Sequence, residues 1–398
     1  MKKILACILI LAAFFTGAAA EPALPGSGTA GGPASGETVI FAATDRHAAY
    51  ETVKAAGDGT PEEEQTPEGK KPPRAGRIPV YDENGSLIWH NNLTDLMRLV
   101  EADGVVPRLV LIGGDFVGLG GDGSRDTTGY PMGSPYFSMK AVDAQVQAVF
   151  GGETGTLYTY GSHDANAVDE YREAFFTGPA DCGNCHVYGI SFAQMVYDTD
   201  RQAAAGKYSG KDLADERGFS ARSASGLFLS WVKSLDDHLP IIVMSHVPLH
   251  AHRGDNYGAW TWMKALNAAA EGHDVIFLWG HNHTMEGRTD GRETERANYL
   301  RLPGEKLTVQ SWETDDRGKE TGVRTIPAED GGETRELVTR TETLRFVYLN
   351  AGYITNGAGT VLSFRDGRMT VKRYALNEEE STEPWTYDLL FPRGDGRD

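Results

Sequence analysis

The segment DVIFLWGHNH, residues 274–283, contains the pattern that decides the fold of this chain. Residues 274–279 are almost wholly apolar, with the length and composition of a buried β-strand. Gly280 follows at once, and His281 and His283 come directly behind it. In open α/β sheets, ligand sites lie just beyond the carboxyl ends of the strands. The segment therefore predicts a strand that delivers polar side chains to a site.

The same arrangement of an apolar strand followed by a polar cluster occurs four more times along the chain. Segments with helical periodicity separate these strands. Short, wholly apolar strands between amphipathic helices are typical of a sheet covered by helices, so an α/β fold is predicted. The other strands are expected at 37–43, 108–112, 156–160 and 240–244, and the clusters behind them contain Asp45, Asp115, Ser162 and His246.

The remaining elements complete one predicted domain over residues 38–375. Two charged segments, 53–78 and 285–343, are interpreted as insertions in this domain, and residues 376–398 as an acidic tail. Helices are expected at 93–101, 138–150, 165–176, 224–238 and 259–270, and three closing strands at 345–349, 360–364 and 369–374.

Residues 1–20 have the features of a signal peptide, and residues 21–37 those of a flexible linker. Lys2 and Lys3 precede an apolar run that ends at Phe15. This run is several residues too short for a typical transmembrane helix. Cleavage is therefore expected, with no transmembrane span afterwards and an exported location in the periplasm, the cell envelope or the medium. A retained anchor is the alternative.

The chain is strongly acidic. Its formal net charge is −18, and 40% of its 398 residues are hydrophobic, which is ample for a buried core. An acidic surface repels nucleic acid and anionic membranes at long range, so no stable nucleic-acid complex is expected. The composition leaves the oligomeric state open.

Together the five polar clusters offer the ligands of a metal site. In an extended segment, residues two apart point the same way, so Asp45 and His47 can reach one ion. Two imidazoles at the same spacing, His281 and His283, also favour a metal. The glycines before Asp115 let the backbone approach closely, and a carboxylate can bridge two cations. Mixed imidazole and carboxylate ligands suit Zn, Mn or Fe(II) better than Ca or Mg alone.

In order and spacing, the clusters resemble the motif blocks of the calcineurin-like metallophosphoesterase family. The blocks are Asp45-x-His47, Gly114-Asp115, Gly161-Ser162-His163-Asp164, His246 and Gly280-His281-x-His283. The resemblance implies a four-layer αββα sandwich, in which two sheets are flanked by helices. It also implies hydrolysis of phosphomonoesters or phosphodiesters of a small substrate at a centre of two divalent metal ions.

The resemblance further implies a role for each motif residue. Asp115 would bridge the two metals, and a hydroxide between them would attack phosphorus. His163 would contact the phosphoryl group and protonate the leaving oxygen, while Asp164 would orient that imidazole. One metal would be held by Asp45, His47 and His283, and the other by His246 and His281.

Ser162 departs from the family pattern, which has Asn at this position. A hydroxyl reaches less far than an amide oxygen, so Ser162 would ligate the second metal weakly or through a water. A degenerate, non-catalytic binding protein on the same fold is therefore the alternative, although His163 beside it favours an enzyme. A serine hydrolase is not supported, because no Gly-x-Ser-x-Gly elbow is found.

Two further residues are weaker candidates for substrate contacts. Arg46 lies between two expected ligands, and His250 follows His246 closely. The identity of the substrate is not indicated. Specificity is expected to come from the loops at 116–136, 178–222 and 248–258.

Cys182 and Cys185 remain once a signal peptide is removed. In an oxidising compartment, the sequence Cys-Gly-Asn-Cys favours a small local disulfide. A redox centre, a metal site with His186 and two separate thiols are the other readings. Gly183 and Asn184 predict a turn between the cysteines.

Overall fold

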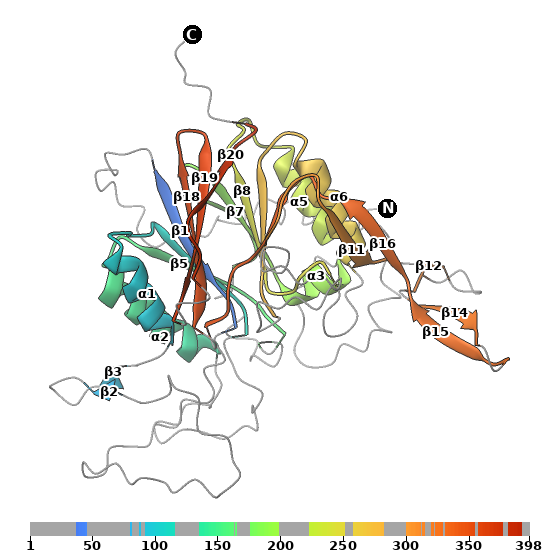
Figure 1. Ribbon diagram of the computed structural model, residues 1–398, viewed down its shortest axis with the longest axis horizontal. Coiled ribbons are helices and arrows are strands. Elements are labelled where there is room, and N and C mark those ends of the chain that lie inside the picture. Colours follow the sequence, from blue (N-terminus) through green and yellow to red (C-terminus); the bar gives the residue numbers. More distant parts are fainter. Residues whose placement is uncertain are drawn as a thin grey trace, which may run out of the picture. The chain divides into compact units, whose positions relative to one another are not determined.

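Two six-stranded sheets form the centre of the fold in the computed structural model of the chain (Figure 1). The strand order is β20-β19-β18-β1-β4-β5 in the first sheet and β10-β17-β9-β8-β7-β6 in the second. The structure describes residues 37–45, 80–81, 87–88, 92–115, 135–162, 164, 176–198, 223–250, 258–281, 300–311, 313–314, 320–321, 323–328, 331–354, 357–376 and 381–391.

The first sheet combines parallel and antiparallel pairing. β1 runs parallel to β4 and β4 parallel to β5, whereas β18, β19 and β20 join β1 through antiparallel pairs. The carboxyl ends of β1, β4 and β5 therefore meet at one edge. The bounds are β1 Thr38–Ala43, β4 Leu109–Gly113, β5 Gly155–Thr159, β18 Ala358–Arg365, β19 Arg368–Ala375 and β20 Trp385–Asp388.

The second sheet has a similar plan. β7, β8, β9 and β17 are parallel neighbours, and β6 and β10 form antiparallel edges. The bounds are β6 Gly178–Asp181, β7 His186–Ile190, β8 Ile241–Ser245, β9 Val275–Trp279, β10 Leu300–Arg301 and β17 Val347–Asn350.

Helices cover the outer face of each sheet (Figure 1). A buried cluster between the sheets joins Leu111 of β4 to Ile242 of β8 and Ile276 of β9. The predicted four-layer αββα sandwich is thus confirmed. Against the first sheet lie α1 (Asn92–Ala102) and α2 (Pro135–Phe150), and against the second lie α3 (Phe192–Tyr197), α5 (Ala224–Val232) and α6 (Ala259–Ala269).

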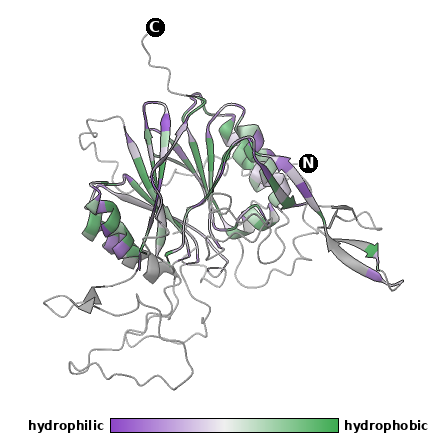
Figure 2. Ribbon diagram, viewed as in Figure 1, coloured by the Kyte–Doolittle hydropathy of each residue, from purple (hydrophilic) through white to green (hydrophobic). Residues whose placement is uncertain are grey.

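The apolar runs of the sequence become strands that are buried on both faces. Every residue of β8 and β9 is buried, as expected for parallel strands that have a layer on each side. Figure 2 shows the central strands of both sheets as largely hydrophobic. Each fully buried large apolar side chain stabilises the fold by about 1.5–3 kcal/mol. This burial holds the strand ends, and the polar clusters behind them, in place.

The predicted helix at 93–101 shows how its sequence pattern leads to packing. Leu93, Leu96, Met97 and Val100 recur at helical spacing, and all are buried in the cluster beneath the first sheet. The helix ends at Ala102, and Gly104 in the turn behind it has a φ of 74°, which suits a residue without a side chain.

The prediction of a loop over 178–222 is wrong for residues 178–198. These residues form β6, β7 and α3, and β7 is an inner strand of the second sheet. The short strand was hard to recognise because Gly189 interrupts its apolar run. A side chain at Gly189 would stand 2.5 Å from the ring of Phe176, so packing requires the glycine.

Part of the acidic tail predicted from residue 376 forms a strand in the first sheet. Residues 385–388 form β20, an antiparallel edge strand beside β19. The carboxylate of Asp274 accepts hydrogen bonds from the backbone of Leu390 and Phe391, at 3.0 and 2.9 Å. This contact comes from a residue 116 positions earlier in the chain, which local sequence patterns do not reveal.

Other predicted segments differ in extent or lie outside the described residues. The helix expected at 224–238 ends at Val232. The insertion at 53–78 and the helix at 165–176, except Phe176, fall outside the described residues. The second insertion contains antiparallel pairs, of which β11–β16 and β14–β15 are the longest. The short strands are β2 Val80–Tyr81, β3 Leu87–Ile88, β11 Lys306–Gln310, β12 Glu313–Thr314, β13 Glu320–Thr321, β14 Val323–Pro327, β15 Glu333–Leu337 and β16 Thr339–Thr343.

Cys182 and Cys185 close the turn between β6 and β7. The backbone N–H of Cys182 donates to the carbonyl of Cys185 at 3.0 Å, and both side chains are buried. A disulfide between the two cysteines remains a prediction from the sequence. Within the described ranges, no helix has the length and apolar composition needed to cross a membrane.

Candidate metal centre

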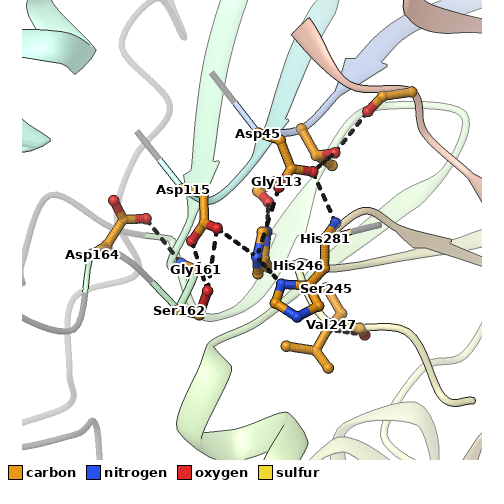
Figure 3. A network of polar contacts seen from close by, with 12 residues as sticks. Asp45, Gly113, Asp115, Gly161, Ser162, Asp164, Ser245, His246, Val247 and His281 are labelled. Atoms are coloured by element: carbon orange, nitrogen blue, oxygen red, sulfur yellow. Dashed lines mark hydrogen bonds and ion pairs between the residues drawn. The ribbon is translucent and has the colours of Figure 1, made fainter. Parts of the chain in front are cut away.

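The loops behind five strands meet at the carboxyl edges of the two sheets. Backbone hydrogen bonds join them directly, from Asp45 N to Gly114 O at 3.2 Å and from Gly280 N to His246 O at 3.0 Å. A third bond runs from Thr44 N to Gly352 O at 2.9 Å. Polar clusters that are far apart in the sequence are thereby brought to one place, as the strand pattern predicts (Figure 3).

Glycines make this close approach possible. A Cβ atom at Gly161 would lie 2.3 Å from the backbone nitrogen of Asp115. A Cβ at Gly280 would lie 2.1 Å from Oγ1 of Thr44, and one at Gly114 would lie 2.6 Å from Gly161. Such distances are too short for any side chain, so these glycines of the motifs are required by packing.

Three site residues have a left-handed backbone that non-glycine residues rarely adopt. The φ angles are 56° for Asp45, 52° for Asp115 and 72° for His281. Each residue stands two positions behind the last residue of a strand, where the turn redirects its side chain toward the others. Conformations of this kind cost about 1–3 kcal/mol each and gather at functional sites.

Asp115, His246 and His281 form a compact set of donor atoms. Nε2 of His246 lies 3.1 Å from Oδ2 of Asp115 and 3.0 Å from Nδ1 of His281. All three donor atoms lie within 4.8 Å of one another. Ligand atoms bonded to one ion at about 2.1 Å are separated by about 3 Å when the angle at the metal is about 90°. The three residues therefore fit the coordination of a single metal ion.

The second nitrogen of His246 is also arranged as in a metal ligand. Nδ1 donates to the backbone carbonyl of Gly113 at 2.8 Å, which directs Nε2 toward Asp115 and His281. A ligating histidine usually donates its other ring nitrogen to a carbonyl or carboxylate in this way. The hydroxyl of Ser245 donates to Val247 O at 3.1 Å and closes the turn that carries His246.

The charge of the site calls for a cation. Burial disfavours the charged form of His246, which is fully buried, yet the carboxylates of Asp115 and Asp45 raise its pKa to about 10. Both carboxylates are at most 1% exposed, so water screens their negative charge only weakly from the imidazole. A divalent ion would neutralise this charge and bind the same imidazole.

Asp45 is oriented by neighbours on both sides. Its Oδ2 accepts hydrogen bonds from Oγ1 of Thr44 at 2.5 Å and from the backbone nitrogen of His281 at 2.8 Å. Its Oδ1 lies 4.0 Å from Nε2 of His246. Asp45 therefore borders the donor set at a distance that suits a ligand of the same or a neighbouring ion.

Ser162 and Asp164 support the loop behind β5. The hydroxyl of Ser162 lies 3.2 Å from each carboxylate oxygen of Asp115. Asp164 is fully buried, and its Oδ2 accepts the backbone N–H of Gly161 at 2.9 Å. Ser162 thus touches the expected bridging carboxylate, and Asp164 holds the turn that brings it there (Figure 3).

Several predicted site residues lie outside the described residues. These residues are Arg46, His47, His163 and His283. Their roles remain predictions from the sequence, as does the presence of a second metal.

The side chain of His250 is buried and packs against aromatic rings. It is 4% exposed, and its Nδ1 accepts the hydroxyl of Tyr348 at 2.7 Å. Its ring meets that of Trp279 edge-on, with centroids 4.8 Å apart. A substrate contact for His250 remains a prediction, and the contacts described above are those of a packed residue.

The turn Asn350-Ala351-Gly352 also reaches the site, although it is not among the polar clusters predicted from the sequence. The carbonyl oxygen of Gly352 accepts a hydrogen bond from the backbone N–H of Thr44. The N–H of Gly352 in turn donates to the side-chain oxygen of Asn350 at 2.8 Å. The signal was present, because this turn also follows a buried strand directly. It was overlooked because it carries no histidine or acidic residue.

Replacing Gly280 by alanine is expected to lower the free energy of unfolding by about 1–3 kcal/mol, as overpacking does, and to weaken metal binding. The added methyl would collide with the side chain of Thr44. Thermal unfolding and metal titration measure the two effects. Gly272→Ala is the matched control, since a Cβ there meets nothing within 4 Å. Equal behaviour of the two variants would contradict the close packing at Gly280.

No family model matches the chain, and no curated protein matches it. Among solved structures it is similar to GAP50, the anchor in the inner membrane complex of Plasmodium, with 9% identity over 90% of each chain and a TM-score of 0.41. It is also similar to PhoD, with 10% identity over 89% of this chain and 70% of that one, and a TM-score of 0.41. A third similar structure is that of a conserved protein of Streptococcus pneumoniae TIGR4 described as a predicted phosphoesterase. The identity is 9% over 89% of this chain and 100% of that one, and the TM-score is 0.26.

Proposed function

We propose that the chain is a metal-dependent phosphoesterase that hydrolyses phosphomonoesters or phosphodiesters of small molecules. The observation that carries the proposal is the convergence of Asp115, His246 and His281 within 4.8 Å at the carboxyl edges of two sheets. Two imidazole nitrogens and a carboxylate suit Zn, Mn or Fe(II). The motif order, with His163 and Asp164 behind β5, adds a proton donor to these ligands.

Each residue has a defined task in this proposal. When bound, two divalent ions supply positive charge to the phosphoryl group and acidify the attacking water. Asp115 would bridge them, and His246 and His281 would hold one of them. Asp45, with the predicted ligands His47 and His283, would hold the other.

His163 is proposed to protonate the leaving oxygen. Its position in the Ser162-His163-Asp164 motif puts it beside a serine that contacts the bridging carboxylate. Asp164 has one carboxylate oxygen bonded to Gly161 N, which fixes the orientation of this turn. A general acid typically contributes about 10²–10⁴-fold to the rate.

We further propose that the protein acts outside the cytoplasm. The support is the leader at residues 1–20, with its two lysines, its apolar run and its small residues before the cleavage point. The mass of the mature protein from the native host tests this point. A mature chain that starts near Glu21 is expected, and an intact leader on the mature chain would contradict the proposal.

The decisive experiment is metal reconstitution of the mature chain, followed by a substrate panel. We expect about two ions per chain and turnover of an aryl phosphate or a bis-aryl phosphate. The panel should add mononucleotides, cyclic nucleotides and phosphodiesters. Metal binding without turnover of any ester would favour the alternative, a non-catalytic binding protein impaired at Ser162. Absence of both would refute the metal centre.

Replacing Ser162 by asparagine is expected to tighten the weaker metal site on the order of tenfold, with equal or higher activity. An amide oxygen is a better neutral ligand than a hydroxyl and reaches further past Asp115. Competition with a chelator measures the change. Ser230→Asn is the control, because Ser230 lies exposed on α5. Unchanged affinity would mean that position 162 is not a ligand position.

A further inference from the structure

Thr44 occupies the point where four loops of the metal centre meet. It is fully buried directly behind β1, and its carbonyl accepts the N–H of Ile354 at 2.8 Å. Its Cγ2 would stand 2.6 Å from a Cβ at either Gly113 or Gly280. The side chain of Thr44 therefore fills the space that these two glycines leave open between the loops behind β4 and β9.

The Thr44 hydroxyl contacts a proposed metal ligand. Oγ1 lies 2.5 Å from Oδ2 of Asp45 and 2.7 Å from the carbonyl oxygen of Gly352. One hydroxyl proton serves these two acceptors, and Gly352 O already accepts the backbone N–H of Thr44. A hydrogen bond to a carboxylate is about twice as strong as one between neutral groups. The hydroxyl is therefore directed mainly to Asp45.

The acceptor side of this contact is rigid as well. The N–H of Gly352 donates to the side chain of Asn350 at 2.8 Å, and its φ is 94°. A Cβ at Gly352 would lie 2.6 Å from Ala358 O, so no other residue fits this turn. Gly352 O thus has a fixed position, and it limits where Oγ1 of Thr44 can lie.

The Asp45 carboxylate is consequently held from two sides. Oδ2 accepts one hydrogen bond from the Thr44 hydroxyl, directly behind β1, and another from the backbone N–H of His281 in the loop behind β9. Oδ1 is then directed toward His246, at 4.0 Å. A neutral donor that fixes one carboxylate oxygen determines where the other oxygen can meet a cation.

We propose that Thr44 is a positioning residue of the metal centre, whose hydroxyl orients the Asp45 carboxylate for metal binding. This inference rests on the metal centre of the proposed function but not on the identity of the substrate. Partners that orient a ligand from outside typically contribute 10–100-fold to metal affinity. We expect the Thr44 hydroxyl to contribute about this factor.

The test is the affinity of purified variants for Mn²⁺ and Zn²⁺, measured by competition with a chelator. Thr44→Val keeps the shape of the side chain and removes the hydroxyl, so a loss of about 10–100-fold is expected. Thr44→Ser keeps the hydroxyl and should stay close to wild type. Thr154→Val is the matched control, because its buried hydroxyl donates to Pro107 O at 2.8 Å, away from the site.

A second pair of variants separates the hydroxyl from general packing. Thr44→Ser and Thr44→Ala differ only in the hydroxyl, so the same loss of affinity should appear between them even where Thr44→Val unfolds. Melting temperatures are recorded for every variant. Equal metal affinity of Thr44→Val and Thr44→Ser, and of Thr44→Ala and Thr44→Ser, would overturn the role of Thr44. The proposed function would still stand. A wild-type chain that binds neither metal would instead overturn the proposed metal centre itself.

Discussion

Replacing Asp115 by asparagine is expected to remove bound metal and to lower kcat/KM for an aryl phosphate by on the order of 10³-fold or more. Mutation of a residue that only orients a metal ligand already lowers metal affinity or activity by about 10–100-fold, so the loss of a ligand should be larger. Oδ2 of Asp115 lies 3.1 Å from Nε2 of His246, within the set of donor atoms. An amide carries no charge and cannot bridge two cations in the same way. The loss should therefore exceed that of any other single ligand.

Metal analysis and steady-state kinetics on the same preparation measure this effect. Asp237→Asn is the matched control. Its carboxylate is hydrogen-bonded at 3.0 Å to His186, the first residue of β7, and so lies at the end of the parallel strands opposite to the site. The control should keep both metal and activity. An Asp115→Asn protein with full metal content and normal turnover would contradict the assignment of the site.

Replacing His163 by asparagine is expected to lower turnover by about 10²–10⁴-fold while metal content stays nearly unchanged. The role proposed for this imidazole is proton donation to the leaving oxygen, and ligation is left to the other motif residues. The effect should shrink for an ester whose leaving group has a low pKa, because such a group departs without a proton. A series of aryl phosphates with different leaving groups measures this dependence.

His238→Asn is the control for this substitution. His238 is exposed and bonds Gly272 O at 2.9 Å, so it has no part in the proposed site. Its variant should behave like wild type with every ester. Substantial metal loss in His163→Asn would show that His163 is a ligand, and an equal loss of rate for all leaving groups would argue against proton donation.

Much of the fold could be predicted because its strands are short and buried on both faces. The predicted run at 274–279 differs from β9 by one residue at one end. The predicted strands at 240–244 and 108–112 differ from β8 and β4 by one residue at each end. A strand covered on both sides must be apolar throughout, and this requirement is visible in one sequence. Polar residues placed directly behind such strands then mark the edge where they collect.

Elements whose stability depends on distant partners were harder to predict. β7 contains Gly189 because the ring of Phe176 leaves no room for a side chain. β20 owes its place to pairing with β19 and to the carboxylate of Asp274. Neither feature has a local pattern, since the residues that require it lie elsewhere in the chain.

The sequence by itself determined which strands are buried and which residue types stand behind them, including Asp115, His246 and His281. Only the tertiary structure decided that Nε2 of His246 lies 3.0 Å from Nδ1 of His281, although the two residues are 35 positions apart. It also decided the surroundings of Thr44, which stands among Gly113, Gly280 and Gly352 and borders Asp45. The physical reason is that burial is a property of each segment, whereas the distance between two ligands depends on how separate strands pack.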